Sequence, residues 1–110
     1  MVDIADTSAL LAWPAERVSS ALAVPSQMAE VEKLSPERAM LYQAQGPEWA
    51  TPSPQSLAEA KTAAAMTGDL PRLSSVDIEL LALALEKQAV LHTDDYRIQN
   101  VATSAGIEWR

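Results

Sequence analysis

Short apolar runs alternate along the chain with longer segments whose apolar residues recur at helical spacing. The runs at 1–5, 48–51, 89–93 and 107–109 predict brief strands. The clearest helix is expected at 74–87, where apolar residues share one face and glutamates point elsewhere. Further helices are expected from a cap at 6–8 to about residue 13, at 16–22 (or a helix running into an extended segment), and at 25–34, 35–45, 54–67 and 95–105.

The order of these elements indicates the fold class. Pro25 suits the first turn of its helix, in which Met28, Val31 and Leu34 lie on one apolar arc. Strands that alternate with helices favour an α/β protein with a parallel sheet. Because the sequence shows no repeat and no linker, residues 1–110 are expected to form a single domain.

Composition excludes several kinds of chemistry. The absence of cysteine excludes disulfides, thiol catalysis and cysteine-based zinc sites. A net charge of −7 argues against a simple basic patch for nucleic acid. No segment approaches the roughly 20 apolar residues of a membrane helix, and the first residues lack the pattern of a signal peptide. A cytoplasmic location without membrane contact is therefore expected.

Acidic residues fall where a parallel sheet collects its ligand-binding loops. Asp6 follows the first predicted strand, and the adjacent pair Asp94 and Asp95 follows the strand at 89–93. Asp77 lies in the first turn of the clearest helix, and Glu30 lies within the helix that Pro25 begins. These positions are candidates for a shared site.

Each of these acids also has a purely structural explanation. Asp6 would cap a helix, and Ser74 with Asp77 resembles a capping box with Asp in place of Glu or Gln. Glu30 would pair with Lys33 on a solvated helix face. The two adjacent aspartates would favour a helix N-terminus, by about 0.3–1 kcal/mol each. Taken singly, the structural explanation is the better one for every position.

Taken together, the acids indicate a cation site. If the first strand and the strand at 89–93 are neighbours, Asp6 and Asp95 converge, and their repulsion raises pKa values unless a cation intervenes. A hard ion such as Mg²⁺ or Mn²⁺ prefers carboxylate oxygens and needs neither Cys nor His. The single histidine, His92, is expected to be a packed strand residue rather than a ligand.

Two stretches, DTSALL at 6–11 and TGDLPRLSSVDIELLALALEKQAVLHTDDYRIQNVA at 67–102, resemble PIN-domain ribonucleases. The second stretch looks particularly like the archaeal Nob-type endonucleases, which mature the 3′ end of small-subunit ribosomal RNA. The resemblance implies a three-layer sandwich with a central parallel sheet of about four to five short strands flanked by helices. It also implies an endoribonuclease that uses one or two Mg²⁺ or Mn²⁺ ions and acts on precursor small-subunit RNA or the pre-ribosomal particle.

The resemblance assigns roles to particular residues. Asp3 and His92 depart from the family pattern in apolar strand positions, but neither is expected to touch a ligand. Arg72 and Arg97 are candidates for RNA-phosphate contacts, with a solvated surface role open for both. The implied catalytic acids and metal ligands are Asp6, Glu30, Asp77 and Asp95, with Asp94 as an auxiliary ligand and Thr7, Ser8 and Thr93 as polar support.

Other functions stay open. A stand-alone toxin-type PIN ribonuclease of the VapC kind, with an antitoxin partner, is one, although such sequences usually lack the QNVA continuation. A PIN-fold binding or assembly module with little activity is another, although the intact acidic set argues against it. A receiver domain would need a late lysine, and none follows Lys87. The family often forms homodimers, and the zinc ribbon that follows the PIN domain in Nob-type proteins has no counterpart here.

Overall fold

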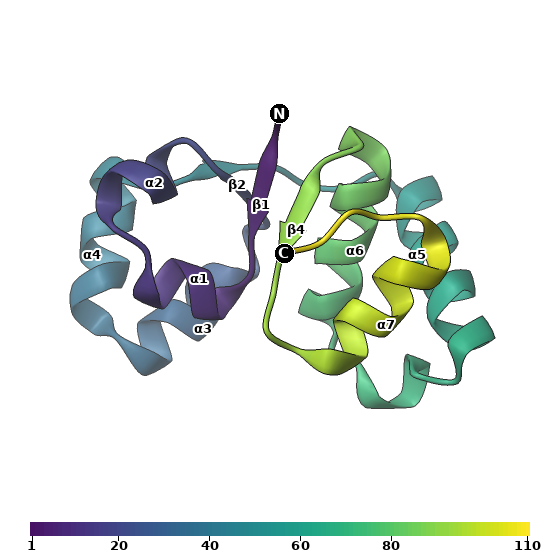
Figure 1. The fold of residues 1–110 in the computed structure, drawn as a ribbon. Helices are drawn as coiled ribbons and strands as arrows, with labels where there is room; N and C mark the ends of the chain where they lie inside the picture. The colour runs from purple at the N-terminus through teal and green to yellow at the C-terminus, as the bar shows by residue number, and fades with distance from the viewer.

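A four-stranded parallel sheet forms the centre of the molecule in the computed structural model, which describes residues 1–110 (Figure 1). The strands are arranged in the order β3-β2-β1-β4. Ile4 of β1 pairs with Leu22 of β2 on one side and with Leu91 of β4 on the other. The strands are β1 (Asp3–Ala5), β2 (Leu22–Ala23), β3 (Glu48–Trp49) and β4 (Val90–His92).

Seven helices and one 3₁₀ turn complete the chain. Serine side chains cap the starts of three of the helices, at Ser35, Ser53 and Ser74. Two of the seven helices end at a glycine in the left-handed region, Gly68 with φ 81° and Gly106 with φ 77°. The elements are α1 (Thr7–Ala12), α2 (Ala15–Ser19), α3 (Gln27–Leu34), α4 (Pro36–Gln45), α5 (Pro54–Thr67), η1 (Leu70–Arg72), α6 (Ser75–Lys87) and α7 (Tyr96–Ala105).

The sheet separates two hydrophobic layers. Helices α1 to α4 cover one face and α5 to α7 cover the other, as Figure 1 shows. Consecutive strand residues alternate between the layers: Ile4 and Leu22 pack with α5 to α7, whereas Ala5 and Ala23 pack with α1 to α4. The expected three-layer α/β sandwich with a parallel sheet is therefore confirmed. None of its helices combines the length and apolar character needed to cross a membrane.

Three local expectations need correction. The segment 107–109 forms no regular strand; Trp109 makes only an isolated bridge to Leu91, at the open edge of the sheet beyond β4. Pro25 lies in a turn before α3, because the side chain of Gln27 accepts the Val24 N–H at 2.8 Å and the helix begins only there. Leu34 is 64% exposed, because α3 ends at this residue and the chain turns into α4.

The two residues that depart from the family pattern contact each other. His92 Nε2 lies 2.8 Å from Asp3 Oδ1, across the β1–β4 pair. Its ring makes a T-shaped contact with Trp13, with ring centroids 4.9 Å apart and planes at 78°. His92 is therefore a packed strand residue, as expected, and Asp3 is tolerated in a strand because it has this partner.

Candidate active site

The site lies at the carboxyl edge of the sheet. Strands β1 and β4 are parallel neighbours, and the Asp6 N–H donates to the His92 carbonyl at 3.1 Å, which continues their pairing by one step. Asp6 therefore emerges directly beside the loop that carries Asp94 and Asp95. The condition on which the cation site depended, that these two strands are neighbours, is met.

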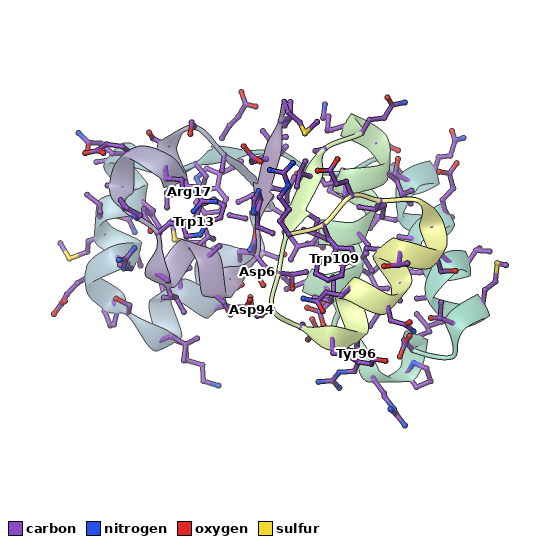
Figure 2. The ribbon with its side chains drawn as sticks, viewed as in Figure 1. Asp6, Trp13, Arg17, Asp94, Tyr96 and Trp109 are labelled. Atoms are coloured by element: carbon purple, nitrogen blue, oxygen red, sulfur yellow. The ribbon has the colours of Figure 1, made fainter.

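One open cavity of about 700 Å³ collects nearly all the predicted residues. Thr93 does not line it; this side chain is buried just behind, where its hydroxyl oxygen accepts the Asp95 N–H at 3.1 Å. Figure 2 shows Asp6 and Asp94 close together, with Tyr96 toward α7. The predicted residues that line the cavity are Asp6, Thr7, Ser8, Glu30, Arg72, Asp77, Asp94, Asp95 and Arg97.

Three of the carboxylates also begin helices. Asp6 accepts the Ala9 N–H of α1 at 2.8 Å, and Asp95 accepts the Arg97 N–H of α7 at 2.9 Å. Asp77 accepts the Ser74 N–H at 2.9 Å and completes the capping box that opens α6. The structural explanation is therefore correct for all three. It does not compete with a site, because capping directs three helix N-termini, each favourable for negative charge, toward one cavity.

The surroundings of Asp6 shift the pKa of its carboxyl. Its side chain is only 7% exposed, and burial raises the pKa of its carboxyl above the ordinary value. Hydrogen bonds from Ala9, Thr93 and the Asp94 backbone counteract this shift, and the negative charge of Asp94 adds to it. The ionised form of Asp6 is therefore held at a cost, which a bound cation would relieve.

Glu30 is held differently from the expectation. It forms no ion pair with Lys33; instead, the Thr7 hydroxyl donates a hydrogen bond to its carboxylate. Gln27 reinforces this contact, since its amide donates to the Ala5 carbonyl at 3.0 Å and approaches the Thr7 hydroxyl at 3.4 Å. Helix α3 is thereby attached to the end of β1, and Glu30 faces the cavity.

The carboxylates share a cavity without forming a ready coordination sphere. No three acidic or histidine side chains in the chain lie close enough together to hold one metal ion. Local hydrogen bonds hold several of the carboxylates at their own helices. The donor set of carboxylates and hydroxyls does suit a hard divalent cation, and the buried charge of Asp6 favours one. The ligand assignment stays a prediction.

Sequence reasoning missed three supporting side chains that lie in the stretch YRIQN. Gln99 donates to the Thr93 carbonyl at 2.8 Å and so fixes the loop of the paired aspartates. Asn100 donates to Asp69 at 2.8 Å, and this bond, with one from Thr67, lowers the pKa of Asp69. Tyr96, 77% exposed, stands on the cavity wall. The amides in the motif were the available signal, since buried loops need such donors.

The two predicted arginines lie on the same side of the cavity. Arg97 Nε is 3.6 Å from Asp95 Oδ1, and its guanidinium donates to the Arg72 carbonyl at 3.3 Å. Arg72 forms no ion pair. The fold thus places two cations beside the acids, and their contact with RNA stays a prediction.

Fold and cavity together define an α/β protein with an acidic ligand site at the ends of its parallel strands. A family model described as "PIN domain of ribonuclease" matches residues 4–86. The chain belongs to this family of PIN-domain ribonucleases, as its resemblance indicated.

Similar proteins include both Nob1 and VapC enzymes. Endoribonuclease Nob1 of Archaeoglobus fulgidus is 38% identical over 98% of this chain and 66% of that protein. Endoribonuclease Nob1 of Pyrococcus abyssi is 46% identical over 54% of this chain and 37% of that protein. Ribonuclease VapC3 of Aeropyrum pernix is 33% identical over 94% of this chain and 81% of that protein. The chain thus spans less than two thirds of the two Nob1 relatives.

Proposed function

We propose that this chain is a divalent-metal-dependent endoribonuclease that hydrolyses RNA phosphodiester bonds during ribosomal RNA maturation. The observation that carries the proposal is the convergence of five carboxylates, from four separate segments of the chain, on one open cavity at the carboxyl edge of the sheet. Membership of a ribonuclease family supports the same reaction. The similarity to archaeal Nob1 proteins supports the substrate, precursor small-subunit ribosomal RNA or the particle that contains it.

In this proposal, Asp6, Asp77 and Asp95 would hold one or two Mg²⁺ or Mn²⁺ ions, with help from Glu30 and Asp94. A bound ion supplies Lewis acidity and lowers the pKa of a water molecule. This role explains how a chain with a net charge of −7 would act on an anionic polymer. The positive charge needed at the reacting phosphate would come from the cation rather than from a basic groove.

Neighbouring side chains position these groups. The Thr7 hydroxyl holds the Glu30 carboxylate, and Thr93 holds the backbone of Asp95. Ser8 is exposed on the cavity wall, where its hydroxyl is free to contact a phosphate oxygen. Arg72 and Arg97 would orient the RNA backbone at the rim.

The test compares cleavage of precursor small-subunit RNA with cleavage of a scrambled RNA, first with Mn²⁺ and then with chelator. Asp95→Asn should abolish cleavage, whereas Glu59→Gln, which removes an exposed charge on α5 away from the cavity, should leave it unchanged. Full metal-dependent activity in Asp95→Asn would refute the site assignment.

A toxin-type ribonuclease is the second candidate, because Ribonuclease VapC3 of Aeropyrum pernix matches nearly the whole chain. The same experiment separates the two. Preference for the precursor's natural 3′ junction supports maturation, whereas equal cleavage of both RNAs removes that role and keeps the nuclease. A binding or assembly module would show no cleavage of either RNA and no stabilisation by Mn²⁺.

A further inference from the structure

A second hollow lies beside the active-site cavity, on the side away from Tyr96. Its volume is about 380 Å³, and it shares Asp6, Ser8 and Asp94 with the first cavity, so the two spaces adjoin along one wall. The opposite wall carries cationic and aromatic side chains. In the view of Figure 2, Trp13 and Arg17 lie on one side of Asp6 and Tyr96 lies on the other.

Arg17 is the arginine of this hollow whose guanidinium has no polar partner within the chain. Its side chain is exposed, and its guanidinium forms neither an ion pair nor a hydrogen bond within the chain. The other arginine of the hollow, Arg110, is paired with Glu108 at 2.8 Å. Arg38, nearby in space, donates to the Leu10 and Trp13 carbonyls and so serves the fold. The N–H donors of Arg17 are therefore free to bind an external acceptor.

Trp13 holds Arg17 in place. The guanidinium carbon lies 3.7 Å from the centroid of the Trp13 ring, which is cation–π geometry. The ring itself is held by the edge contact with His92, and His92 is held by Asp3. This contact places the guanidinium over one face of the ring, and its N–H donors have no hydrogen-bond acceptor within the chain. Trp13 is correspondingly unsuited to stack a nucleotide base on the face that Arg17 covers.

The charged side chains around the hollow indicate which kind of ligand it binds. Asp6 and Asp94 on the shared wall would repel a free carboxylate ligand, which has no other contact to bring it to this wall. A phosphate on the same RNA strand is already brought to this wall when its neighbour occupies the first cavity. A guanidinium presents a planar fork that matches phosphate oxygens.

We propose that Arg17, held on Trp13, binds the phosphate of a nucleotide next to the scissile bond. This inference rests on the proposed ribonuclease function. It gives the RNA strand two cationic supports, Arg72 and Arg97 on one side of the acids and Arg17 on the other. The cut phosphate lies between them.

The first test measures RNA binding without cleavage. The probe is a fluorescein-labelled single-stranded RNA that the unaltered protein cuts with Mn²⁺, and binding is followed by anisotropy at low ionic strength with Ca²⁺ in place of Mn²⁺, so that the carboxylates still have a hard cation. Arg17→Gln should bind about threefold to fivefold more weakly and reduce the salt slope by about 0.7. Lys61→Gln is the matched control, because it removes the same charge from exposed α5 and lines neither hollow.

The second test identifies the phosphate. A series of the same RNA carries one neutral methylphosphonate at each successive position beside the cut. At one flanking position, the neutral group should weaken binding by the unaltered protein and have no further effect on Arg17→Gln. Trp13→Leu should lose part of the same coupling, because the guanidinium is then no longer held.

The outcomes separate the two proposals. If the unaltered protein cuts RNA while Arg17→Gln matches Lys61→Gln at every position, the Arg17 contact is refuted and the nuclease stands. If weakening follows Trp13→Leu but not Arg17→Gln, the ring stacks on a base and the phosphate contact is wrong. If the unaltered protein neither binds nor cuts RNA, the proposed function itself fails, and the inference with it.

Discussion

Asp6 offers the sharpest test of the proposed site, because its charge and its capping role can be removed separately. Asp6→Asn removes the buried charge and keeps an N-cap for α1, since Asn and Asp cap helices about equally well. Asp6→Ala removes both. In chelator at neutral pH, Asp6→Asn should be more stable than the unaltered protein, because burial disfavours the ionised carboxyl.

The magnitudes follow from these two roles. Loss of the cap in Asp6→Ala should cost about 1 kcal/mol relative to Asp6→Asn. For a domain of this size that difference corresponds to roughly 4 °C in Tm. Divalent metal should reverse the first comparison, so that the unaltered protein becomes more stable than Asp6→Asn. At a hundred times its Kd, a ligand that binds only the folded state adds about 2.7 kcal/mol, and only the unaltered protein should gain it in full.

The pH dependence has a defined sign. The folded-state pKa of Asp6 is raised above the unfolded value near 3.8, so the folded state binds a proton more tightly in this window. The stability of the unaltered protein relative to Asp6→Asn should fall as the pH rises from about 3.8 through the raised pKa. Above that pH the difference should stay constant.

Thermal unfolding followed by circular dichroism, in chelator and in a Mn²⁺ series, measures all of these quantities. Cleavage of labelled RNA by the same samples shows whether Asp6→Asn is inactive. The reasoning is wrong if Asp6→Asn is less stable than the unaltered protein in chelator and both gain equally from Mn²⁺.

Three further changes test other parts of the fold. Gln88 has φ 52° at the end of α6, so Gln88→Gly should stabilise the protein by about 0.5 kcal/mol in urea unfolding; a loss would contradict the strain. Ser74→Ala removes half of the α6 capping box and should cost about 1 kcal/mol in the same assay, and an unchanged midpoint would deny the box any role. Leu91→Ala, at a fully buried strand position, should cost about 2–5 kcal/mol of unfolding free energy. A cost below that of Ser74→Ala would show that Leu91 does not lie in the hydrophobic core.

Local signals made much of the fold predictable. Helix α5 begins and ends at the predicted residues, and α4 begins one residue later than predicted, because Ser-Pro starts and glycine stops act within a few positions of the boundary. Long-range pairing was less accessible. The segment 107–109 has the composition of a strand, yet whether it joins a sheet depends on partners far away in sequence. Leu34 has an apolar side chain at helical spacing, yet the turn into α4 leaves it exposed.

The candidate site was likewise predictable from the sequence only in part. The acids were found because each follows a strand or opens a helix, and strand order then brought them together. Their distances were not predictable, since they depend on competing hydrogen bonds such as that from Thr7 to Glu30. Arg17 was missed because its place in a hollow shared with Asp94 is a tertiary feature, although its contact with Trp13 is local in the sequence.

The pairing of β1 with β4 has a consequence for the nascent chain during protein synthesis. Asp6 is synthesised well before Asp95, and the contact between their strands joins residues far apart in the sequence. Contacts of such high sequence separation form late in folding. A nascent chain in which β4 has not yet been made therefore lacks Asp94 and Asp95. The proposed site is therefore incomplete until β4 has been synthesised and has paired with β1.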